Sequence, residues 1–232
     1  MTTPPARRAL LYGVLLLGGI AACSVVPSPS AGKGPKAPPW AHLFDGKTLT
    51  GWERKAVHGG RGGLWEVRNG VLVGNQDADH SGGLLGTRRK HGDAEVELEF
   101  RADFPADSGL FLRTAPNGDG YQVTLDNKAD GFIGSLYVPS SGFVAQDRGW
   151  AKKYQPGAWN RLRARIAGQP PRVQVWLNGK PTVDFRDTRK RLPRTGYLGL
   201  QVHGGAGSWG KNSRIRFRNL RLRDLSAPAV RP

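Results

Sequence analysis

The sequence predicts an all-β fold, a β-sandwich of two antiparallel sheets. Short runs of alternating apolar and polar residues recur along the chain and are separated by turn residues. Glycine occurs 33 times and proline 17 times among 232 residues, and no long stretch has helical periodicity. We expect roughly eleven to thirteen short strands, and a β-sandwich is the simplest fold that accommodates them.

Residues 1–22 have the features of a lipoprotein-type signal peptide. Two arginines form a basic start, and the apolar stretch 9–20 that follows is too short to span a bilayer comfortably. The next residues, Ile20-Ala21-Ala22-Cys23, resemble a bacterial lipobox, in which cleavage leaves the cysteine as a lipidated N-terminus.

Cys23 is the only cysteine in the chain, which excludes an intramolecular disulfide. We expect Cys23 to be lipidated and to anchor an exported protein to a bacterial membrane of the cell envelope, on its periplasmic or surface side. The alternative is an ordinary signal peptide or an uncleaved anchor, in which the cysteine is incidental. The protein is expected to be exported in either case.

The folded domain is expected to span residues 40–225. Residues 23–39 are rich in proline, serine, glycine and alanine and cannot bury enough apolar surface to fold, so they are expected to form a flexible tether. Residues 226–232 are expected to be a disordered tail.

The chain carries a strong positive charge, with 35 basic and 18 acidic residues. Without residues 1–22, which hold two arginines and no acids, 33 − 18 leaves +15. Such a charge is compatible with nucleic acid, anionic lipid or anionic glycan. However, the arginines alternate within expected strands and do not cluster with stacking aromatics, so we expect no nucleic acid partner. A sheet face paired with Glu95, Glu97 and Glu99 explains them more simply.

The strands follow in order from alternation and turn residues. Asn69-Gly70 and Asn178-Gly179 suit two-residue hairpin turns, and Pro105 ends a strand because proline cannot donate to a ladder. Residues 139–157 are expected to form a long loop, which in a compact domain is usually functional or mobile. The expected strands are residues 64–67, 71–74, 83–87, 93–103, 109–114, 121–125, 132–138, 159–167, 172–177, 181–185, 196–203 and 213–222.

Residues 93–126 are the stretch around which the rest is expected to be arranged. Apolar and charged residues alternate strictly over 93–103, which predicts one face on the core and one face in water. Two further strands, 109–114 and 121–125, follow after turns. We expect the three to be adjacent antiparallel strands with one polar face, a platform that could hold a polar ligand.

A series of phrases between Leu43 and Leu225 resembles, in order, the 3-keto-disaccharide hydrolase domain family. No single phrase is specific, but the ordered set is. The resemblance implies a concanavalin A-like jelly roll, which agrees with the strand count. The phrases include LFDGKTLTGW (43–52), HGDAEVELEFR (91–101), DSGLFLRT (107–114), GYQVTLDN (120–127) and GYLGLQVHG (196–204).

The resemblance implies cleavage of glycosides whose glucose unit carries a ketone at carbon 3. That ketone acidifies the hydrogen on carbon 2, so a base can remove it, the enolate expels the group at carbon 1, and water then adds. Such a site needs a base with a pKa near neutral, a donor for the leaving oxygen, and a cation or hydrogen-bond pair for the enolate. It differs from the two carboxylates of ordinary glycosidases.

Three residues that match the family pattern are expected to be catalytic. His203, in the L-Q-x-H-G phrase, is expected to be the general base or acid, because histidine titrates near neutrality unaided. Arg113 could stabilise an enolate, and Asp126 ends the G-Y-x-V-x-x-D phrase. The structural alternative for Arg113 is a cross-strand pair with a carboxylate such as Asp126.

Substrate contacts are expected from strand amides and loop aromatics. Trp150 and Trp209 are candidates for stacking on a sugar. The family usually has glutamate and glutamine where this chain has Gln122 and Thr124, and glutamine cannot exchange a proton as glutamate does. The expected substrate-binding residues are Gln122, Thr124, Tyr137, Trp150, Gln201 and Trp209.

No cofactor and no metal are expected. Asp77, Asp79 and His80 share one polar loop, but they lack the spacing of zinc ligands and of a twelve-residue calcium loop. The glycine-rich loops lack the strand–loop–helix context of phosphate-binding sites.

The leading hypothesis is an exported, lipid-anchored enzyme that cleaves 3-keto-glucosides or 3-keto-disaccharides by elimination and hydration, or by net hydrolysis. Two alternatives remain open. One is a non-catalytic carbohydrate-binding module on the same fold, consistent with Gln122. The other is a structural envelope protein whose basic face contacts anionic lipid or glycan. The sequence defines neither the aglycone nor the oligomeric state.

Overall fold

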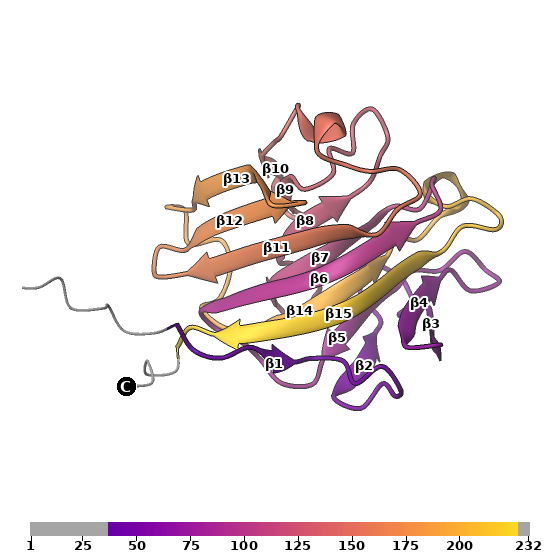
Figure 1. Ribbon diagram of the computed structural model, residues 1–232, viewed down its shortest axis with the longest axis horizontal. Helices are drawn as coiled ribbons and strands as arrows, with labels where there is room; N and C mark the ends of the chain where they lie inside the picture. Colours follow the sequence, from indigo (N-terminus) through magenta and orange to yellow (C-terminus); the bar gives the residue numbers. More distant parts are fainter. Residues whose placement is uncertain (1–36, 227–232) are drawn as a thin grey trace, which may run out of the picture. The chain divides into compact units, whose positions relative to one another are not determined.

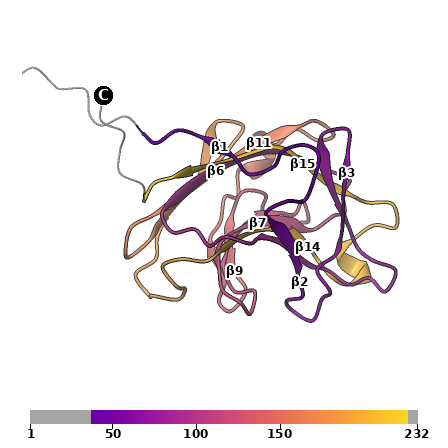
Figure 2. The same cartoon turned by 90° about the horizontal axis from the view of Figure 1, so that it is seen from below.

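Residues 37–226, which the computed structural model describes, form two antiparallel β-sheets packed face to face (Figures 1 and 2). This confirms the predicted all-β two-sheet class. The signal peptide, Cys23 and nearly all of the predicted tether and tail lie outside the described residues.

Sheet A has eight strands in the order β13-β12-β11-β6-β15-β4-β3, with β1 paired to β15. Its longest strands, β6, β11 and β15, lie side by side (Figure 1). The bounds are β1 Ala41–His42, β3 Leu64–Arg68, β4 Val71–Asn75, β6 Ala94–Ala102, β11 Asn160–Ala167, β12 Arg172–Leu177, β13 Lys180–Arg186 and β15 Ile215–Asp224.

Sheet B has seven strands in the order β10-β9-β8-β7-β14-β5-β2. The expected long loop 139–157 contains an edge strand, β10, and a short 3-10 helix, η1. The bounds are β2 Trp52–Lys55, β5 Gly83–Thr87, β7 Ser108–Thr114, β8 Tyr121–Leu125, β9 Leu136–Val138, β10 Gly142–Ala145, η1 Trp150–Lys152, β14 Tyr197–Val202 and η2 Ala206–Ser208.

The expected platform of three adjacent strands over residues 93–126 is wrong. β6 pairs with β11 and β15 in sheet A, whereas β7 pairs with β8 and β14 in sheet B. Residues 103–107, which we call the crossing segment, carry the chain from one sheet to the other. Alternation along a strand predicts its buried face but not its partners, and consecutive strands are not always neighbours.

One apolar core lies between the sheets, and β8 shows how alternation builds it. Tyr121, Val123 and Leu125 point into the core, so Gln122 and Thr124 point to the face of sheet B turned away from sheet A. The core residues from β6, β7, β8 and β11 are Val96, Leu98, Phe100, Leu110, Leu112, Tyr121, Val123, Leu125, Leu162, Ala164 and Ile166.

The outer face of sheet A carries the expected ladder of acidic and basic side chains. β6 lies between β11 and β15, so arginines flank its glutamates on both sides. Arg161 and Arg221 both pair with Glu97, which is only 6% exposed. The face expected to be wet is therefore covered, because the long arginine side chains lie over the shorter acids.

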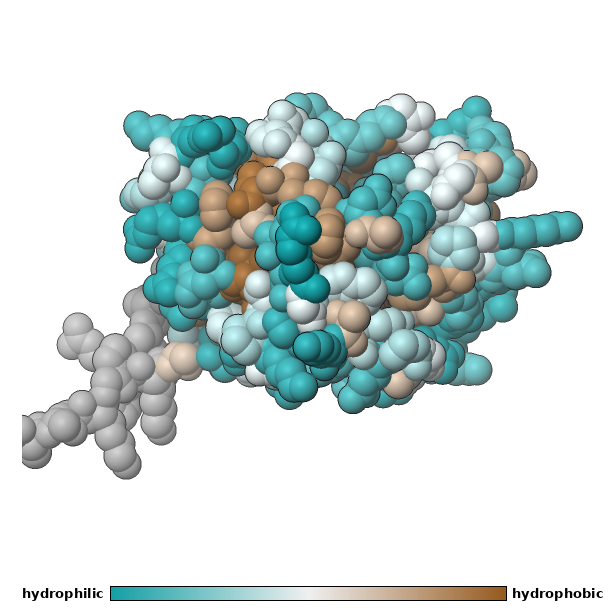
Figure 3. Space-filling view, turned by 90° about the horizontal axis from the view of Figure 1, so that it is seen from above, coloured by the Kyte–Doolittle hydropathy of each residue, from teal (hydrophilic) through white to brown (hydrophobic). Residues whose placement is uncertain are grey.

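Apolar residues reach the surface mainly at the sheet edges. Figure 3, which views the sandwich from the side of β10, β13 and η1, shows hydrophobic residues flanked by hydrophilic ones. Within residues 37–226 the exposed large hydrophobic residue is Leu64, on the edge strand β3. No helix in this part of the chain is long and apolar enough to cross a membrane.

Replacing Glu97 by glutamine should destabilise the protein by about 1–2 kcal/mol at pH 7, because two arginines lose their charged acceptor. Burial raises the pKa of Glu97, but hydrogen bonds and charge from Arg161 and Arg221 outweigh it and lower the pKa overall. The stabilisation is therefore present above the ordinary glutamate pKa and is lost as pH falls through the lowered one. Urea unfolding at pH 7 and at low pH measures it.

Glu66→Gln is the matched control, because the pair of Glu66 with Arg68 is exposed. It should change stability little. Equal losses of stability in Glu97→Gln and Glu66→Gln would contradict the claim that the arginine pairs of Glu97 stabilise the fold.

Candidate functional site

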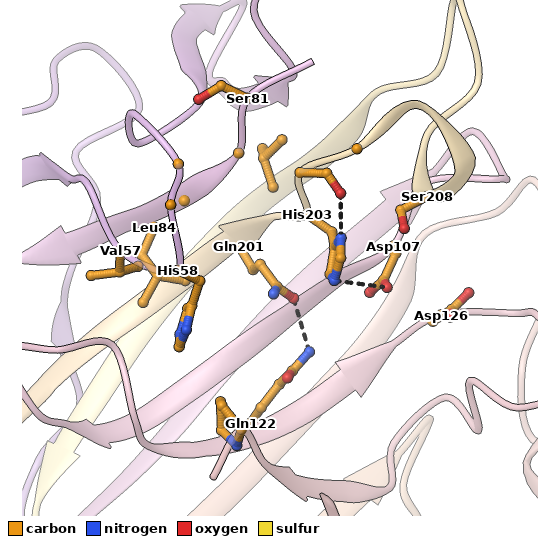
Figure 4. Close-up of a pocket in the computed structure, with 18 of the residues that line it drawn as sticks. Val57, His58, Ser81, Leu84, Asp107, Gln122, Asp126, Gln201, His203 and Ser208 are labelled. Atoms are coloured by element: carbon orange, nitrogen blue, oxygen red, sulfur yellow. Dashed lines mark hydrogen bonds and ion pairs between the residues drawn. The ribbon is translucent and has the colours of Figure 1, made fainter. Parts of the chain in front are cut away.

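A cavity of about 1040 Å³ lies on the face of sheet B turned away from sheet A (Figure 4). Side chains of β5, β7, β8 and β14 form its floor, and four loops form its walls. We call it the main cavity. Its volume suits a ligand the size of a disaccharide or larger. The loops contribute residues from 57–61, 79–83, 126–131 and 203–208.

A pair of amides crosses the floor of the main cavity. Nε2 of Gln122 on β8 donates to Oε1 of Gln201 on β14 over 2.8 Å, passing across β7 (Figure 4). Gly109 of β7 makes this possible, since a Cβ there would lie 2.7 Å from Cγ of Gln122. Oε1 of Gln122 and Nε2 of Gln201 make no hydrogen bond to any described residue, so one acceptor and one donor remain for a ligand.

Glycines form one wall because backbones touch there. A Cβ at Gly82 would lie 2.3 Å from the carbonyl oxygen of Val202, and one at Gly60 would lie 2.2 Å from that of Gly82. Only glycine fits at both positions. The wall brings His58 and His80 to the main cavity.

His203, just after β14, presents one ring nitrogen to the main cavity. Its Nδ1 lies 2.7 Å from the carbonyl oxygen of Gly204, which can only accept, so Nδ1 carries the hydrogen. In the neutral ring Nε2 is therefore a free acceptor. It lies 3.8 Å from Oδ2 of Asp107 (Figure 4), and the side chain is 45% exposed.

Asp107 faces His203 from the end of the crossing segment. Burial raises the pKa of Asp107 to about 6; the charge of His203 opposes this rise and the charge of Asp126 adds to it. A carboxyl with this pKa exchanges its proton near neutrality, as an imidazole does. Asp107 and His203 thus form a pair that can hold one proton between them.

Gln76 fixes the loop that carries His203. It is 7% exposed, and its Nε2 donates to the carbonyl oxygens of His203 and Gly205 over 2.7 and 3.0 Å. Its Oε1 accepts from Nδ1 of His80 over 3.2 Å. One buried amide therefore links two histidines at the main cavity.

Six predicted site residues line the main cavity together, although they come from three strands and two loops. The hydroxyl of Thr124 donates a hydrogen bond to the carbonyl oxygen of Phe132, and the carboxylate of Asp126 accepts one from the backbone N–H of Lys128. These two residues thus shape the loop after β8. The six are Gln122, Thr124, Asp126, Tyr137, Gln201 and His203.

Arg113 does not line the main cavity. It is 1% exposed and pairs with Asp93, over 2.7 Å, and not with Asp126. Asp126 lies at the opposite end of the β7–β8 hairpin, where Leu125 faces Ser108. The structural alternative for Arg113 is thus a pair with Asp93 and not with Asp126, and Arg113 lies away from the main cavity.

The two loop tryptophans predicted to stack on a sugar, Trp150 and Trp209, lie in different parts of the structure, and neither lines the main cavity. Trp209 is 6% exposed, and its indole N–H donates to Oδ1 of Asn75 and to the carbonyl oxygen of Ser213, so it is not a stacking surface for a sugar. Ala106 forms a β-bridge with Trp209, which therefore braces the crossing segment. Trp150 lies at a second cavity, described below.

Sequence reasoning missed Asp107 as a site residue. It opens the DSGLFLRT phrase, but nothing in the sequence places the end of the crossing segment against His203. His58, Arg61 and His80 were also missed, because they lie in glycine-rich loops that could equally have been solvated. Among the described residues, no cluster of three or more histidine, cysteine, aspartate or glutamate side chains is placed to hold a metal ion.

Residues 39–223 match the model of the 3-keto-alpha-glucoside-1,2-lyase-like domain family, 3keto-disac_hyd. The chain belongs to this family. The match covers the whole sandwich and every residue of the main cavity. No protein of curated function matches the chain.

Solved structures agree on the fold of this family member. A "putative glycosyl hydrolase" from Parabacteroides distasonis ATCC 8503 has a TM-score of 0.58 and 22% identity, covering 81% of this chain and 100% of that one. The carbohydrate-binding module CBM66 from Bacillus subtilis has a TM-score of 0.51 and 16% identity, covering 75% of this chain and 95% of that one. A Bacillus subtilis protein of unknown function with a galectin-like fold has a TM-score of 0.59 and 11% identity, covering 82% of this chain and 97% of that one. The predicted lectin-like jelly roll is confirmed.

Asp107→Asn should stabilise the protein at pH 8 by about 1–3 kcal/mol and give no gain at pH 4. The raised pKa means that the protonated carboxyl stabilises the fold below the ordinary aspartate pKa, and that this stability is lost as pH rises through about 6. Asparagine carries no charge at either pH. Thermal or urea unfolding at the two pH values measures the difference.

Asp184→Asn is the control, because the pKa of Asp184 is shifted in the opposite direction to that of Asp107. The hydrogen bond from Arg172 lowers it. It should give no gain at pH 8. If Asp107→Asn raised the free energy of unfolding as much at pH 4 as at pH 8, the claim that burial raises the pKa of Asp107 would be contradicted.

Proposed function

We propose that the domain cleaves 3-keto-glucosides or 3-keto-disaccharides by removing the proton on carbon 2. The observation that carries the proposal is the pair of His203 and Asp107 in the main cavity, with the Nδ1 of His203 held by the carbonyl oxygen of Gly204 and the side chain partly exposed. Membership in the 3-keto-alpha-glucoside-1,2-lyase-like family supports the same chemistry. Without the pair, the cavity would offer only a binding surface.

His203 accepts the proton from carbon 2, and the carboxylate of Asp107 stabilises the imidazolium that forms. The electron pair of the C–H bond moves to the carbon 3 oxygen and gives an enolate. The enolate then expels the oxygen on carbon 1, and the proton held by the pair passes to that leaving oxygen. Water adds across the new double bond, so the net reaction is hydrolysis.

The amide pair supplies a donor for the enolate oxygen. Nε2 of Gln201 is not used within the described part of the chain and lies on the cavity floor. It takes the role that the sequence assigned to Arg113, which points elsewhere. A neutral donor of this kind stabilises a developing oxyanion in a partly buried site. Gln122 orients it through Oε1 of Gln201.

A non-catalytic carbohydrate-binding module is the second candidate. The cavity combines the partly exposed rings of Tyr137 and Phe143 with the Gln122–Gln201 pair, apolar rings beside fixed polar groups. This combination is typical of sugar binding without chemistry. It leaves the His203–Asp107 pair unexplained, so we prefer the enzyme.

Incubating residues 24–232 with 3-keto-trehalose should release the second sugar, because the pair supplies the base. His203→Ala should lower kcat by about 10²- to 10⁴-fold, the usual contribution of a general base. Asp107→Asn should lower kcat and remove the titration near pH 6 from the rate profile. Chromatography of the released sugar measures each rate.

His42→Ala is the matched control, since His42 is exposed on β1 of sheet A. It should keep the full rate. Sugar binding without release by the wild-type protein would reject the enzyme in favour of the binding module. Neither binding nor release would favour a structural envelope protein whose basic sheet face contacts anionic lipid or glycan.

We also propose that the protein is exported and lipid-anchored through Cys23. The support is the sequence alone: a basic start, a short apolar stretch and a lipobox-like Ile-Ala-Ala-Cys with the chain's only cysteine. A lipid anchor would hold the domain at a bacterial membrane, where exported glycosides pass.

Palmitate labelling in a bacterial host should mark the wild-type chain and not Cys23→Ala. The reason is that the thiol is the attachment point for the lipid. A serine variant, Cys23→Ser, should also stay unlabelled and should leave the membrane fraction after washing. Labelling that persists in both variants would refute the anchor.

A further inference from the structure

A second cavity of about 380 Å³ has three aromatic residues among the eight that line it. Phe104 of the crossing segment, Trp150 of η1 and Tyr154 line it. The ring centroid of Tyr154 lies 6.0 Å from that of Trp150 and 5.8 Å from that of Phe104. The three rings form a cup, which we call the aromatic cavity, and such a cup suits a planar apolar group.

Polar atoms at the rim of the aromatic cavity have no internal partners. The indole N–H of Trp150 and the phenol O–H of Tyr154 make no hydrogen bond to residues 37–226, and neither does the amide of Asn127. Burial raises the pKa of Tyr154, so its phenol stays protonated and can donate. The cavity therefore offers flat apolar walls with a few hydrogen-bonding groups, as small-molecule sites do.

Two segments contribute to both cavities, which makes the cavities neighbours. In the crossing segment Phe104 lines the aromatic cavity and Asp107 lines the main one. After β8, Asp126 lines the main cavity and the next residue, Asn127, lines the aromatic one. The two cavities therefore lie on either side of these two segments, with Asp107 and Asp126 facing the main one.

We propose that the aromatic cavity binds the ring of an aromatic aglycone whose sugar occupies the main cavity. The inference rests on the proposed function of the main cavity. An aromatic ring suits this lining, which is mostly apolar, and a phenolic oxygen on it can pair with the few polar groups. The preferred substrates are then aryl 3-keto-glucosides, with the ring held by Trp150 and Phe104.

Equilibrium dialysis of 4-nitrophenol against residues 24–232 tests the aromatic cavity without any turnover. The wild-type chain should bind the probe saturably, and Trp150→Leu should weaken binding by about tenfold. Asn127→Ala, at an exposed position, should weaken it less and cannot unfold the core. His203→Ala should bind as the wild type does, because His203 lines the other cavity.

Trp176→Leu is the matched control, since Trp176 stacks with Arg163 and lies outside the aromatic cavity. Circular dichroism confirms that each variant is folded. Binding unchanged in both Trp150→Leu and Asn127→Ala, or no saturable binding by the wild type, would overturn the proposal. So would a loss in His203→Ala as large as that in Trp150→Leu.

Kinetics then connect the aromatic cavity to catalysis. Trp150→Leu should raise KM about tenfold for the 3-keto derivative of 4-nitrophenyl glucoside and change KM for 3-keto-trehalose by less than about twofold. Equal changes for the two substrates would overturn an aryl-specific site. If the wild-type chain cleaves neither substrate, the proposed function fails, and the dialysis result still decides whether the aromatic cavity binds a phenol.

Discussion

The crossing segment, residues 103–107, is the constraint on which the site depends. It takes the chain from the middle of sheet A to the middle of sheet B, so β6 and β7 become facing strands and not neighbours. The backbone N–H of Asp107 donates to the carbonyl oxygen of Ser208, and the N–H of His203 donates to the carbonyl oxygen of Asp107. Buried Trp209 braces the same segment. These contacts set Asp107 against His203 and turn Phe104 toward the aromatic cavity.

The two outer faces of the sandwich differ: that of sheet A carries paired charges, and that of sheet B carries the main cavity. On sheet A, arginines cover the glutamates of β6, so much of the positive charge neutralises the protein's own acids. On sheet B, Gly109 and the glycine-rich loops leave room where side chains would otherwise fill the surface. The core between the sheets is continuous and contains residues of both. A rigid floor keeps the amide pair and His203 in fixed positions, as catalysis or sugar recognition requires.

Local patterns predicted the fold class and the core-facing side of strands such as β6, β8 and β11, because alternation separates the two faces of a strand. Turn residues predicted the β3–β4 and β12–β13 hairpins, and β7 does pair with β8. They did not predict that β6 leaves for the other sheet, so the three-strand platform was wrong. At the site, Gln122, Thr124 and Gln201 could be predicted from alternation and family phrases, since they lie in regular strands. Asp107 could not, because its role depends on a non-local contact with His203. The partners of Arg113 and Trp209, Asp93 and Asn75, were missed for the same reason, because they are distant in sequence.

The central claim is that His203, supported by Asp107, removes the proton on carbon 2. Running the reaction on 3-keto-trehalose in heavy water and recording the product by NMR tests it most directly. The account predicts that 3-keto-glucose released by the wild-type chain carries deuterium at carbon 2, and that His203→Ala slows both product release and exchange of that hydrogen by about 10²- to 10⁴-fold. Release of a product that keeps its original hydrogen at carbon 2 would contradict the account, because the bond at carbon 1 would then break by direct displacement.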